Sequence, residues 1–166
     1  MSKAEWMDRI RLEPIREDEI PQMYEMQIES FMPLYEKYHD AGSPAVESIE
    51  KVRASAAVPW RKYYFIVRDG ERVGAVNISC PPGLNDKTIF YISPLFIVPR
   101  CQNQGIGYAA IQKVFALHPE ASCWRLDTIL QEPGNCHLYE KCGFVRTGGE
   151  HVINDAMTLI GYELKR

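Results

Sequence analysis

The sequence predicts a mixed α/β fold of the α+β type, formed by a single domain over residues 1–166. Its 166 residues suit one domain, and a hydrophobic content of 46% is enough for an ordinary core. Segments with a helical spacing of apolar residues alternate with runs that are typical of strands. Along the chain these segments give the order β-α-α-β-β-β-α-β-α-β-β, without internal repeats or a low-complexity linker.

The first part of the chain predicts one strand and two helices. Residues 10–15 alternate between apolar and polar side chains, which is typical of a short strand. We expect Asp18 to cap a helix that Pro33 ends, and Ser43 to cap a second helix with Pro44 at its first position. In the first helix, apolar residues recur at helical spacing at Ile20, Met23, Ile28 and Phe31, with Gln27 as a polar exception. The second helix is expected to bury Val46, Ile49 and Val52.

The middle of the chain is rich in strand-forming residues. Asp69-Gly70 joins two such runs and predicts a tight hairpin. A longer strand over residues 87–98 contains Pro94, which lacks a backbone donor, so we expect a bulge near residues 93–96.

The last part of the chain predicts two helices and three strands. A helix follows Gly105 and Gly107, ends before Pro119, and places Ile106, Ala110, Val114 and Leu117 on one face. The remaining elements are a strand over 123–130, a short helix over 135–142 that Gly143 ends, and strands near 144–148 and 152–164.

Charge and composition argue against nucleic-acid binding, membrane contact and metal binding. The net charge is −3 and no basic stripe offsets it, so we expect no nucleic-acid partner. No apolar stretch is long enough for a signal peptide or a membrane span, so we expect no membrane contact. The five cysteines lack paired C-x-x-C spacing, which favours reduced thiols in a cytoplasmic protein and no bound metal.

The stretch FIVPRCQNQGIGYAA, residues 96–110, carries the clearest chemical signal. An apolar run leads into a polar loop without acidic residues, and Gly105 and Gly107 stand where the next helix begins. Helix N-termini bind anions through unpaired N–H groups, and glycine lets a phosphate approach the backbone. A tight turn that needs glycine only for its dihedral angles explains the pair equally well.

A dinucleotide site is another interpretation of the same glycines. Residues 105–110 match G-x-G-x-x-A, and Asp127 follows Gly107 by 20 residues, where a ribose-binding carboxylate is expected. Two observations count against this interpretation. Six residues separate the strand from Gly105, and too few strand–helix units follow.

Two motifs together resemble the GNAT superfamily of acyl-CoA-dependent N-acyltransferases. Gln102-Asn103-Gln104-Gly105-Ile106-Gly107 is similar to the Q/R-x-x-G-x-G/A motif of that family. Residues 135–144, NCHLYEKCGF, are similar to its second signature, with Cys136 as a departure. The resemblance implies a twisted mixed sheet of about six to seven strands, splayed at the central strands and flanked by about four helices.

The resemblance also implies a site for acetyl-CoA, the acyl-donor cosubstrate. Amides of the loop and helix start would bind the pyrophosphate, and backbone groups of Phe96 and Val98 would pair with the pantetheine arm. Arg100 adds positive charge near the loop, although a solvated surface position explains it as well. The residues implied in cofactor binding are Phe96, Ile97, Val98, Gln102, Asn103, Gln104, Gly105, Ile106, Gly107, Tyr108, Asn135 and Tyr139.

Tyr139, within the second signature, is implied as the proton donor to the departing thiolate. The pKa values of thiols and tyrosine lie about two units apart, so a phenol suits that role, and packing on the helix is the alternative. Asn135 stands where a helix N-cap belongs, which alone explains its type and is compatible with a place near the pantetheine. We expect His137 at the surface.

The general base and the acceptor site are less well defined by the sequence. Glu132, Glu29 and Tyr91 are candidates for the base, and each is also compatible with a solvated or packing role. The acceptor site is expected between the first two helices. Its candidate residues are Glu29, Phe31, Tyr35, Tyr38 and Tyr91.

The leading functional hypothesis is an N-acetyltransferase that moves an acetyl group from acetyl-CoA to a primary amine by direct attack in a ternary complex, without a metal. None of the cysteines has a convincing partner for covalent catalysis. The acceptor is an amine of a small molecule or peptide, and the last strand allows a homodimer. The alternatives are a non-catalytic domain that senses acyl-CoA, and a dinucleotide-binding enzyme.

Overall fold

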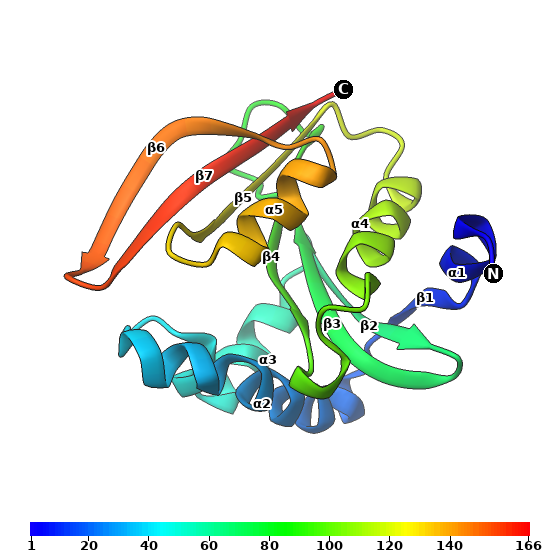
Figure 1. Ribbon diagram of the computed structural model, residues 1–166, viewed down its shortest axis with the longest axis horizontal. Helices are drawn as coiled ribbons and strands as arrows, with labels where there is room; N and C mark the ends of the chain where they lie inside the picture. Colours follow the sequence, from blue (N-terminus) through cyan, green and yellow to red (C-terminus); the bar gives the residue numbers. More distant parts are fainter.

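A computed structural model describes the whole chain, residues 1–166. One seven-stranded sheet, with the order β1-β2-β3-β4-β5-β7-β6, runs through it (Figure 1). All neighbouring strands are antiparallel except β4 and β5, which are parallel. The strands are β1 (Ile10–Pro14), β2 (Arg61–Arg68), β3 (Glu71–Ser79), β4 (Ile89–Ile97), β5 (Cys123–Ile129), β6 (Val145–Asn154) and β7 (Met157–Lys165).

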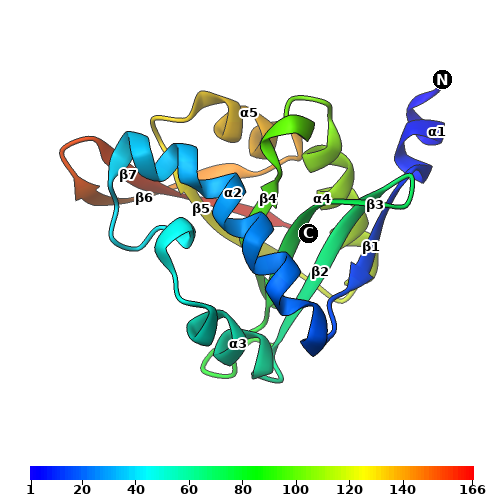
Figure 2. The same ribbon diagram turned by 90° about the horizontal axis from the view of Figure 1, so that it is seen from below.

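Helices cover both faces of the sheet. Figures 1 and 2 show α2 and α3 on one face and α4 and α5 on the other, with α1 beside the start of β1. None of these helices combines the length and the apolar composition that a membrane crossing needs. Their bounds are α1 (Lys3–Asp8), α2 (Ile20–Tyr38), α3 (Ile49–Ala57), α4 (Ile106–Leu117) and α5 (Pro133–Lys141). The mixed α/β architecture and the element order are confirmed, with α1 as an additional helix.

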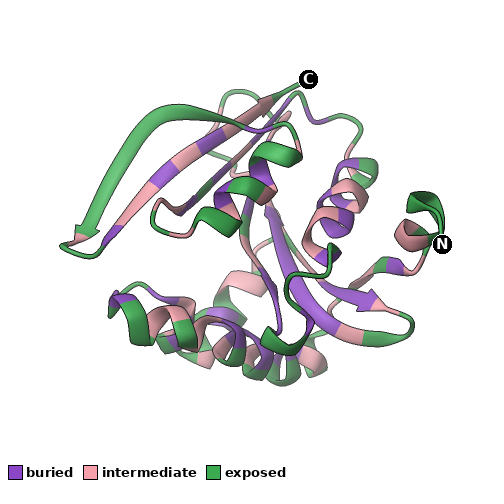
Figure 3. Ribbon diagram, in the orientation of Figure 1, coloured by how far each residue is buried: buried purple, intermediate pink, exposed green.

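The hydrophobic core fills the space between the sheet and its helices. Buried residues are concentrated on β2, β3, β4 and the inner side of α4 (Figure 3). The largest of them is Trp124, which is fully buried in β5 and lies near the rings of Phe90 and Phe115. In contrast, β6 is exposed along nearly its whole length. Successive residues are buried at Phe65–Val67 of β2 and Val73–Ile78 of β3, so both faces of the sheet are covered there and these strands support the loops at their ends.

The two central strands diverge after a short parallel contact. β4 and β5 pair only at Ile89–Cys123, Phe90–Trp124 and Tyr91–Arg125, and then separate (Figure 1). The expected bulge lies just beyond this point, because Ser93 and Pro94 together oppose Asn77 of β3. The Asn77 side-chain amide donates to the Ser93 carbonyl at 2.7 Å and so fixes the bulge. The sheet therefore opens in its centre, as the splayed fold predicts.

The boundaries predicted for the first helix are wrong at both ends. Asp18 lies in a 3-10 turn (Glu17–Glu19), where its carboxylate pairs with Arg16, and it does not cap α2. The helix passes through Pro33 and ends at Tyr38. The carbonyl of Glu29 loses its helical partner at Pro33, but Glu29 is exposed, so water can satisfy it.

Two further predictions of helix position and burial need correction. Ser43 caps only a 3-10 turn (Pro44–Val46), whereas α3 begins later and is capped by Ser48, whose hydroxyl accepts from the Lys51 amide at 3.2 Å. Val46 is 46% exposed and Leu117 is 47% exposed, so neither belongs to the core. Val46 lies in the turn rather than on a buried helical face, and Leu117 is the last residue of α4.

Candidate active site

The loop between β4 and α4 presents a row of unpaired backbone N–H groups. Asn103 (φ 61°) and Gly105 (φ 80°) have left-handed backbone angles, which turn the chain toward the helix start. The amides of residues 103–108 donate to no acceptor within the chain. The amide of Gln102 is instead used inside the loop, since it donates to the Pro99 carbonyl at 3.2 Å. The row of amides at a helix N-terminus is suited to bind an anion.

The two glycines of the loop serve different structural purposes. Gly105 precedes α4 and needs its positive φ, and a Cβ there would lie 3.5 Å from the Trp6 indole nitrogen. Gly107 lies inside the first turn of α4, where a Cβ would come within 3.1 Å of Leu138. Glycine at this second position lets α4 approach α5 closely. The tight-turn explanation and the anion-binding explanation therefore both apply.

Positive side chains flank the start of α4. Lys3 and Lys141 lie on the ring of Tyr108, at 4.9 and 4.8 Å from its centroid, and the Lys3 amine donates to the Tyr108 hydroxyl at 3.2 Å. Arg100 contributes less free charge than the sequence suggests, because it pairs with Glu71 at 2.7 Å. Lys3 was not predicted from the sequence, because α1 is too short to show a helical period.

At the end of β4, the residue whose backbone groups face the gap is not one of those expected. The Val98 amide donates to the Val73 carbonyl at 2.9 Å, and Phe96 opposes Ala75, so both face β3. Because backbone groups alternate along a strand, Ile97 faces the gap toward β5. The Ile97 carbonyl accepts from the Gln102 side chain at 2.8 Å. The backbone groups of Phe96 and Val98, which were predicted to pair with the pantetheine arm, therefore face β3, and the groups on the open side belong to Ile97.

Tyr139 lies on the inner side of α5. Its ring packs against the rings of Phe144 and Tyr162, with centroids 6.0 and 6.1 Å away. Burial raises the pKa of Tyr139 to about 12, so the phenol keeps its proton at neutral pH. Asn135 lies within the first turn of α5, which begins at Pro133, so it is not the N-cap residue. His137 is exposed, as expected.

Glu132 is held by two residues at the end of α2. Its carboxylate pairs with the Lys37 amine at 2.7 Å and accepts a short hydrogen bond from the Tyr38 hydroxyl. Burial acts to raise the pKa of Glu132, but the hydrogen bonds from Lys37 and Tyr38 outweigh it and the net pKa is lowered. This group of Lys37, Tyr38 and Glu132, the α2–α5 clasp, joins the two faces of the open sheet. A carboxylate engaged in this way is a poor base.

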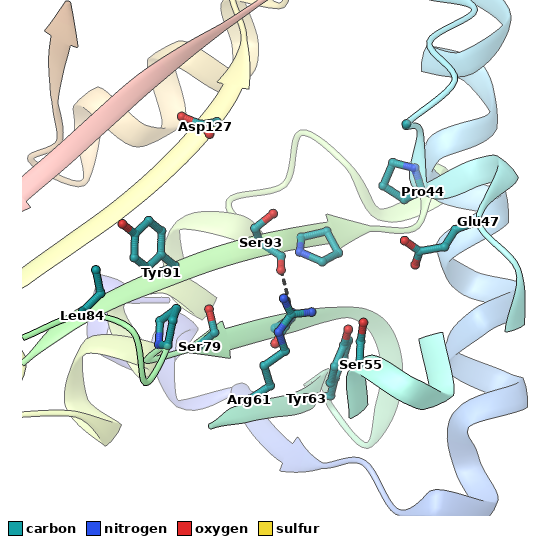
Figure 4. Close-up of a pocket in the computed structure, with 14 residues that line it drawn as sticks. Pro44, Glu47, Ser55, Arg61, Tyr63, Ser79, Leu84, Tyr91, Ser93 and Asp127 are labelled. Carbon is teal, nitrogen blue, oxygen red and sulfur yellow. Dashed lines mark hydrogen bonds between the residues drawn. The ribbon is translucent and has the colours of Figure 1, made fainter. Parts of the chain in front are cut away.

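A polar cavity lies at the mouth of the β4–β5 gap, on the side of α3 (Figure 4). Its volume is about 490 Å³, and Ser93, Pro94 and Asp127 line it just beyond the last pair of β4 and β5. Among the residues expected in the acceptor site, Tyr91 lines the cavity and contacts Arg125 through its hydroxyl at 3.4 Å.

The other acceptor-site candidates lie outside this cavity. Glu29 is exposed on α2, and Phe31 packs edge-on against Phe96 with centroids 5.7 Å apart. Tyr35 lies against His39 at the same separation, and Tyr38 belongs to the clasp. These residues follow one another closely along α2, but the sequence did not show which of their side chains face the gap.

The sequence did not predict that Arg61, Asn77 and Asp127 line the cavity, although Asp127 was considered as a ribose-binding carboxylate. Arg61, Asn77 and Asp127 reach it from β2, β3 and β5. The Arg61 Nε and Asn77 Oδ1 atoms are buried without a hydrogen-bond partner in the chain. A signal was present, because Asn77 interrupts an apolar run of β3 and Asp127 stands inside a strand. No group of three or more His, Cys, Asp or Glu side chains is arranged to hold a metal ion.

Comparison with known proteins assigns this arrangement to a family. Residues 14–144 match the sequence profile of the acetyltransferase (GNAT) family. The chain belongs to the GNAT family. The uncharacterized protein YrkN of Bacillus subtilis (strain 168) is 30% identical to this GNAT protein over 161 residues, which cover 93% of this chain and 84% of YrkN.

Solved structures of acetyltransferases share the fold of this GNAT protein. The spermidine N-acetyltransferase of Vibrio cholerae, in complex with CoA and spermine, matches with a TM-score of 0.74 and 14% identity over 95% of this chain and 96% of its own. AAC(6')-Ib, in complex with ribostamycin and coenzyme A, matches with a TM-score of 0.74 and 18% identity over 96% and 94%. At such identities the likeness concerns the fold.

Proposed function

We propose that this GNAT protein is an acetyl-CoA-dependent N-acetyltransferase that acts, as a single domain, on a primary amine of a small molecule or peptide. The observation that carries the proposal is the opening between β4 and β5. The amide-lined loop and Tyr139 lie on one side of it, and the polar cavity opens on the other. Two reactants can therefore meet at the gap from opposite faces of the sheet.

The residues around the loop fit coenzyme A. The free amides of residues 103–108 would bind the pyrophosphate, with Lys3 and Lys141 close enough to add positive charge. Ile97, on the free edge of β4, would pair with an amide of the pantetheine arm, and Asn135, in the first turn of α5, would lie near that arm. Structural neighbours that hold CoA support this assignment.

The cavity and Tyr139 supply the groups that the transfer requires. Asp127, which hydrogen-bonds to no group of the chain, would accept a proton from the acceptor ammonium. The free amine would then attack the thioester carbonyl carbon to give a tetrahedral intermediate. As the carbon–sulfur bond breaks, the nitrogen would release its second proton to solvent and become the amide nitrogen. Tyr139 would donate a hydrogen bond and then its proton to the departing thiolate, and regain a proton from solvent. Glu132 is not assigned this role because of its place in the α2–α5 clasp.

The first test is calorimetric titration with acetyl-CoA, with NAD as the control ligand. We expect acetyl-CoA to bind the wild type, and Gly105→Glu to abolish binding by placing a carboxylate among the amides. Gly105→Gln is the matched control, because it imposes the same backbone strain without the charge and should retain more affinity.

Turnover separates an enzyme from a sensor. Release of free CoA is measured with a panel of primary amines that includes monoamines, polyamines, amino acids and aminoglycosides. Acetyl-CoA binding without turnover on any amine would support the sensor alternative and refute the proposed reaction. Binding of NAD in place of acetyl-CoA would refute the cofactor assignment.

A further inference from the structure

The charged residues of the cavity differ in the hydrogen bonds and ion pairs that they form within the chain. They are Glu47, Arg61 and Asp127. Glu47 is engaged at its rim, since it accepts from Gln27 at 3.3 Å and pairs with Lys51 at 3.7 Å. Arg61 forms no ion pair with any carboxylate of the chain, although it is partly buried.

Arg61 is held in place without an ion pair, and the Tyr63 hydroxyl is a polar neighbour of its guanidinium. Its guanidinium lies 4.8 Å from the centroid of the Trp60 ring, which restricts its orientation. Its Nε atom is buried and donates to nothing in the chain. A partly buried cation without an ion pair is costly, so a hydrogen-bond acceptor or an anion that reaches the guanidinium is favoured. The guanidinium fork matches a carboxylate with two parallel hydrogen bonds.

Arg61 and Asp127 lie on opposite walls of the cavity. Arg61 rises from β2, beside Tyr63 and Ser55, whereas Asp127 comes from β5, with Tyr91 and Ser93 of β4 between the two walls (Figure 4). Asp127 lies on the wall nearer to the β4–β5 opening, where the proposed reaction takes place. The cavity therefore offers a negative group near the reaction centre and a positive group away from it.

We propose that the acceptor is a zwitterionic amine, an amino acid or short peptide, whose carboxylate binds Arg61 while its ammonium group approaches Asp127. This inference rests on the proposed N-acetyltransferase function and names its substrate class. Because β3 and β4 lie between β2 and β5 in the sheet, an amine that is several bonds away from the carboxylate is favoured. A polyamine or an aminoglycoside would place positive charge beside Arg61, which Coulomb repulsion disfavours.

A matched set of acceptors tests the proposal. The set is 6-aminohexanoic acid, its carboxamide, hexylamine and spermidine, and initial rates of CoA release give kcat and KM for each. For the wild type we expect a KM for the acid that is about tenfold to a hundredfold below that for the carboxamide, as a charged hydrogen-bonded pair provides. Spermidine should be a poorer acceptor than the acid.

Variants assign the preference to one side chain. Arg61→Gln should remove the difference between acid and carboxamide by raising the KM for the acid, and leave the carboxamide unchanged. Arg61→Lys should retain part of the preference for the acid, since lysine keeps the positive charge but lacks the paired N–H groups of the guanidinium. Lys62→Gln, at the exposed neighbour on β2, is the control and should keep the full preference. Unchanged acetyl-CoA affinity in calorimetry shows that each variant is folded.

The outcomes separate this inference from the function on which it rests. Acetylation of hexylamine or spermidine at least as efficient as that of the acid would overturn the inference and leave the N-acetyltransferase function standing. A full preference for the acid in Arg61→Gln would likewise overturn the inference alone. Acetyl-CoA binding without acetylation of any amine would overturn both.

Discussion

At the scale of single residues, the surroundings of a side chain decide which chemistry it can perform. Tyr139 and Glu132 were both candidates for proton transfer, and their environments separate them. Burial keeps Tyr139 protonated, so it suits the role of a donor. Both Lys37 and Tyr38 bond to Oε2 of Glu132 and lower the pKa of its carboxyl group, so it is a weak proton acceptor. Their positions in the sequence made both residues candidates for proton transfer, and only their contacts in the structure show which of them suits the role.

Replacement of Tyr139 by phenylalanine removes the proton donor with little change in volume. We expect Tyr139→Phe to lower kcat about a hundredfold, within the range for general acid catalysis, and to leave the KM for acetyl-CoA nearly unchanged. Steady-state rates of CoA release measure both constants. Tyr35→Phe is the control, because Tyr35 lies outside the cavity. Equal kcat values for Tyr139→Phe and the wild type would exclude the donor role.

The raised pKa of Tyr139 also has a consequence for alkaline stability. The phenol ionises near pH 10 in the unfolded chain but only near pH 12 in the folded protein, so the folded state binds more protons between these values. The contribution of Tyr139 to the free energy of unfolding is therefore complete below pH 10 and is lost as the pH rises through 12.

At the scale of elements, the α2–α5 clasp connects helices from opposite faces of the open sheet. Tyr38 contributes twice, because its hydroxyl donates to Glu132 and its carbonyl accepts from the Asn154 side chain at 2.8 Å. The end of α2 is thereby tied both to α5 and to the turn of the β6–β7 hairpin. The segment after α2 leads into Pro44 and Glu47, which line the cavity. The clasp therefore positions one wall of the cavity.

Glu132→Gln should loosen this connection without unfolding the protein. The lost ion pair is partly exposed, so we expect the free energy of unfolding to fall by about 1 kcal/mol or less. Amide hydrogen exchange in the last turn of α2 should become faster, and the KM for the acceptor should rise. Glu36→Gln, an exposed neighbour on α2, is the control.

The pH dependence of the same region gives an independent check. Because the folded pKa of Glu132 is lowered, the clasp contributes stability above the unfolded pKa and loses it as the pH falls through the folded value. Exchange at the end of α2 that is as slow in Glu132→Gln as in the wild type would show that the clasp has no such role.

The sequence predicted elements whose signals are local and missed features that depend on distant contacts. Asp69-Gly70 alone specifies its hairpin, with positive φ at both residues, and Pro94 alone predicts the bulge. The passage of α2 through Pro33 depends on the exposure of Glu29, which no local pattern reveals. The placement of Arg61 and Asp127 across one cavity arises only when β2 and β5 are assembled in the sheet.

At the scale of the whole molecule, the sheet consists of two parts joined by a short parallel contact. Strands β1 to β4 form one part and β5, β7 and β6 the other, and only the first residues of β4 and β5 pair across the junction. A ligand that bridges both parts adds contacts that the folded protein has and the unfolded chain lacks. Ligand binding should therefore stabilise the entire fold.

Coenzyme A should raise the melting temperature markedly. At a concentration about one hundred times its Kd, a ligand stabilises the native state by about 2.7 kcal/mol. For a chain of this length that corresponds to a shift of about 5–10 °C. Thermal unfolding monitored by fluorescence measures the shift, and Gly105→Glu should show none. A wild-type protein that binds CoA in calorimetry but melts at the same temperature would contradict this prediction.

The divergence of β4 from β5 gives the sheet a third edge, in its interior rather than at its rim. Sheets of different molecules associate at unpaired edges, and proteins commonly protect them. Here α2 covers one face of β4 and α4 the other, so a strand from another molecule would meet helices before it reached the free amides (Figures 1 and 2). A narrow, flexible chain with its own amide groups can enter. The interior edge is therefore open to a small ligand but shielded from pairing with a strand of another molecule.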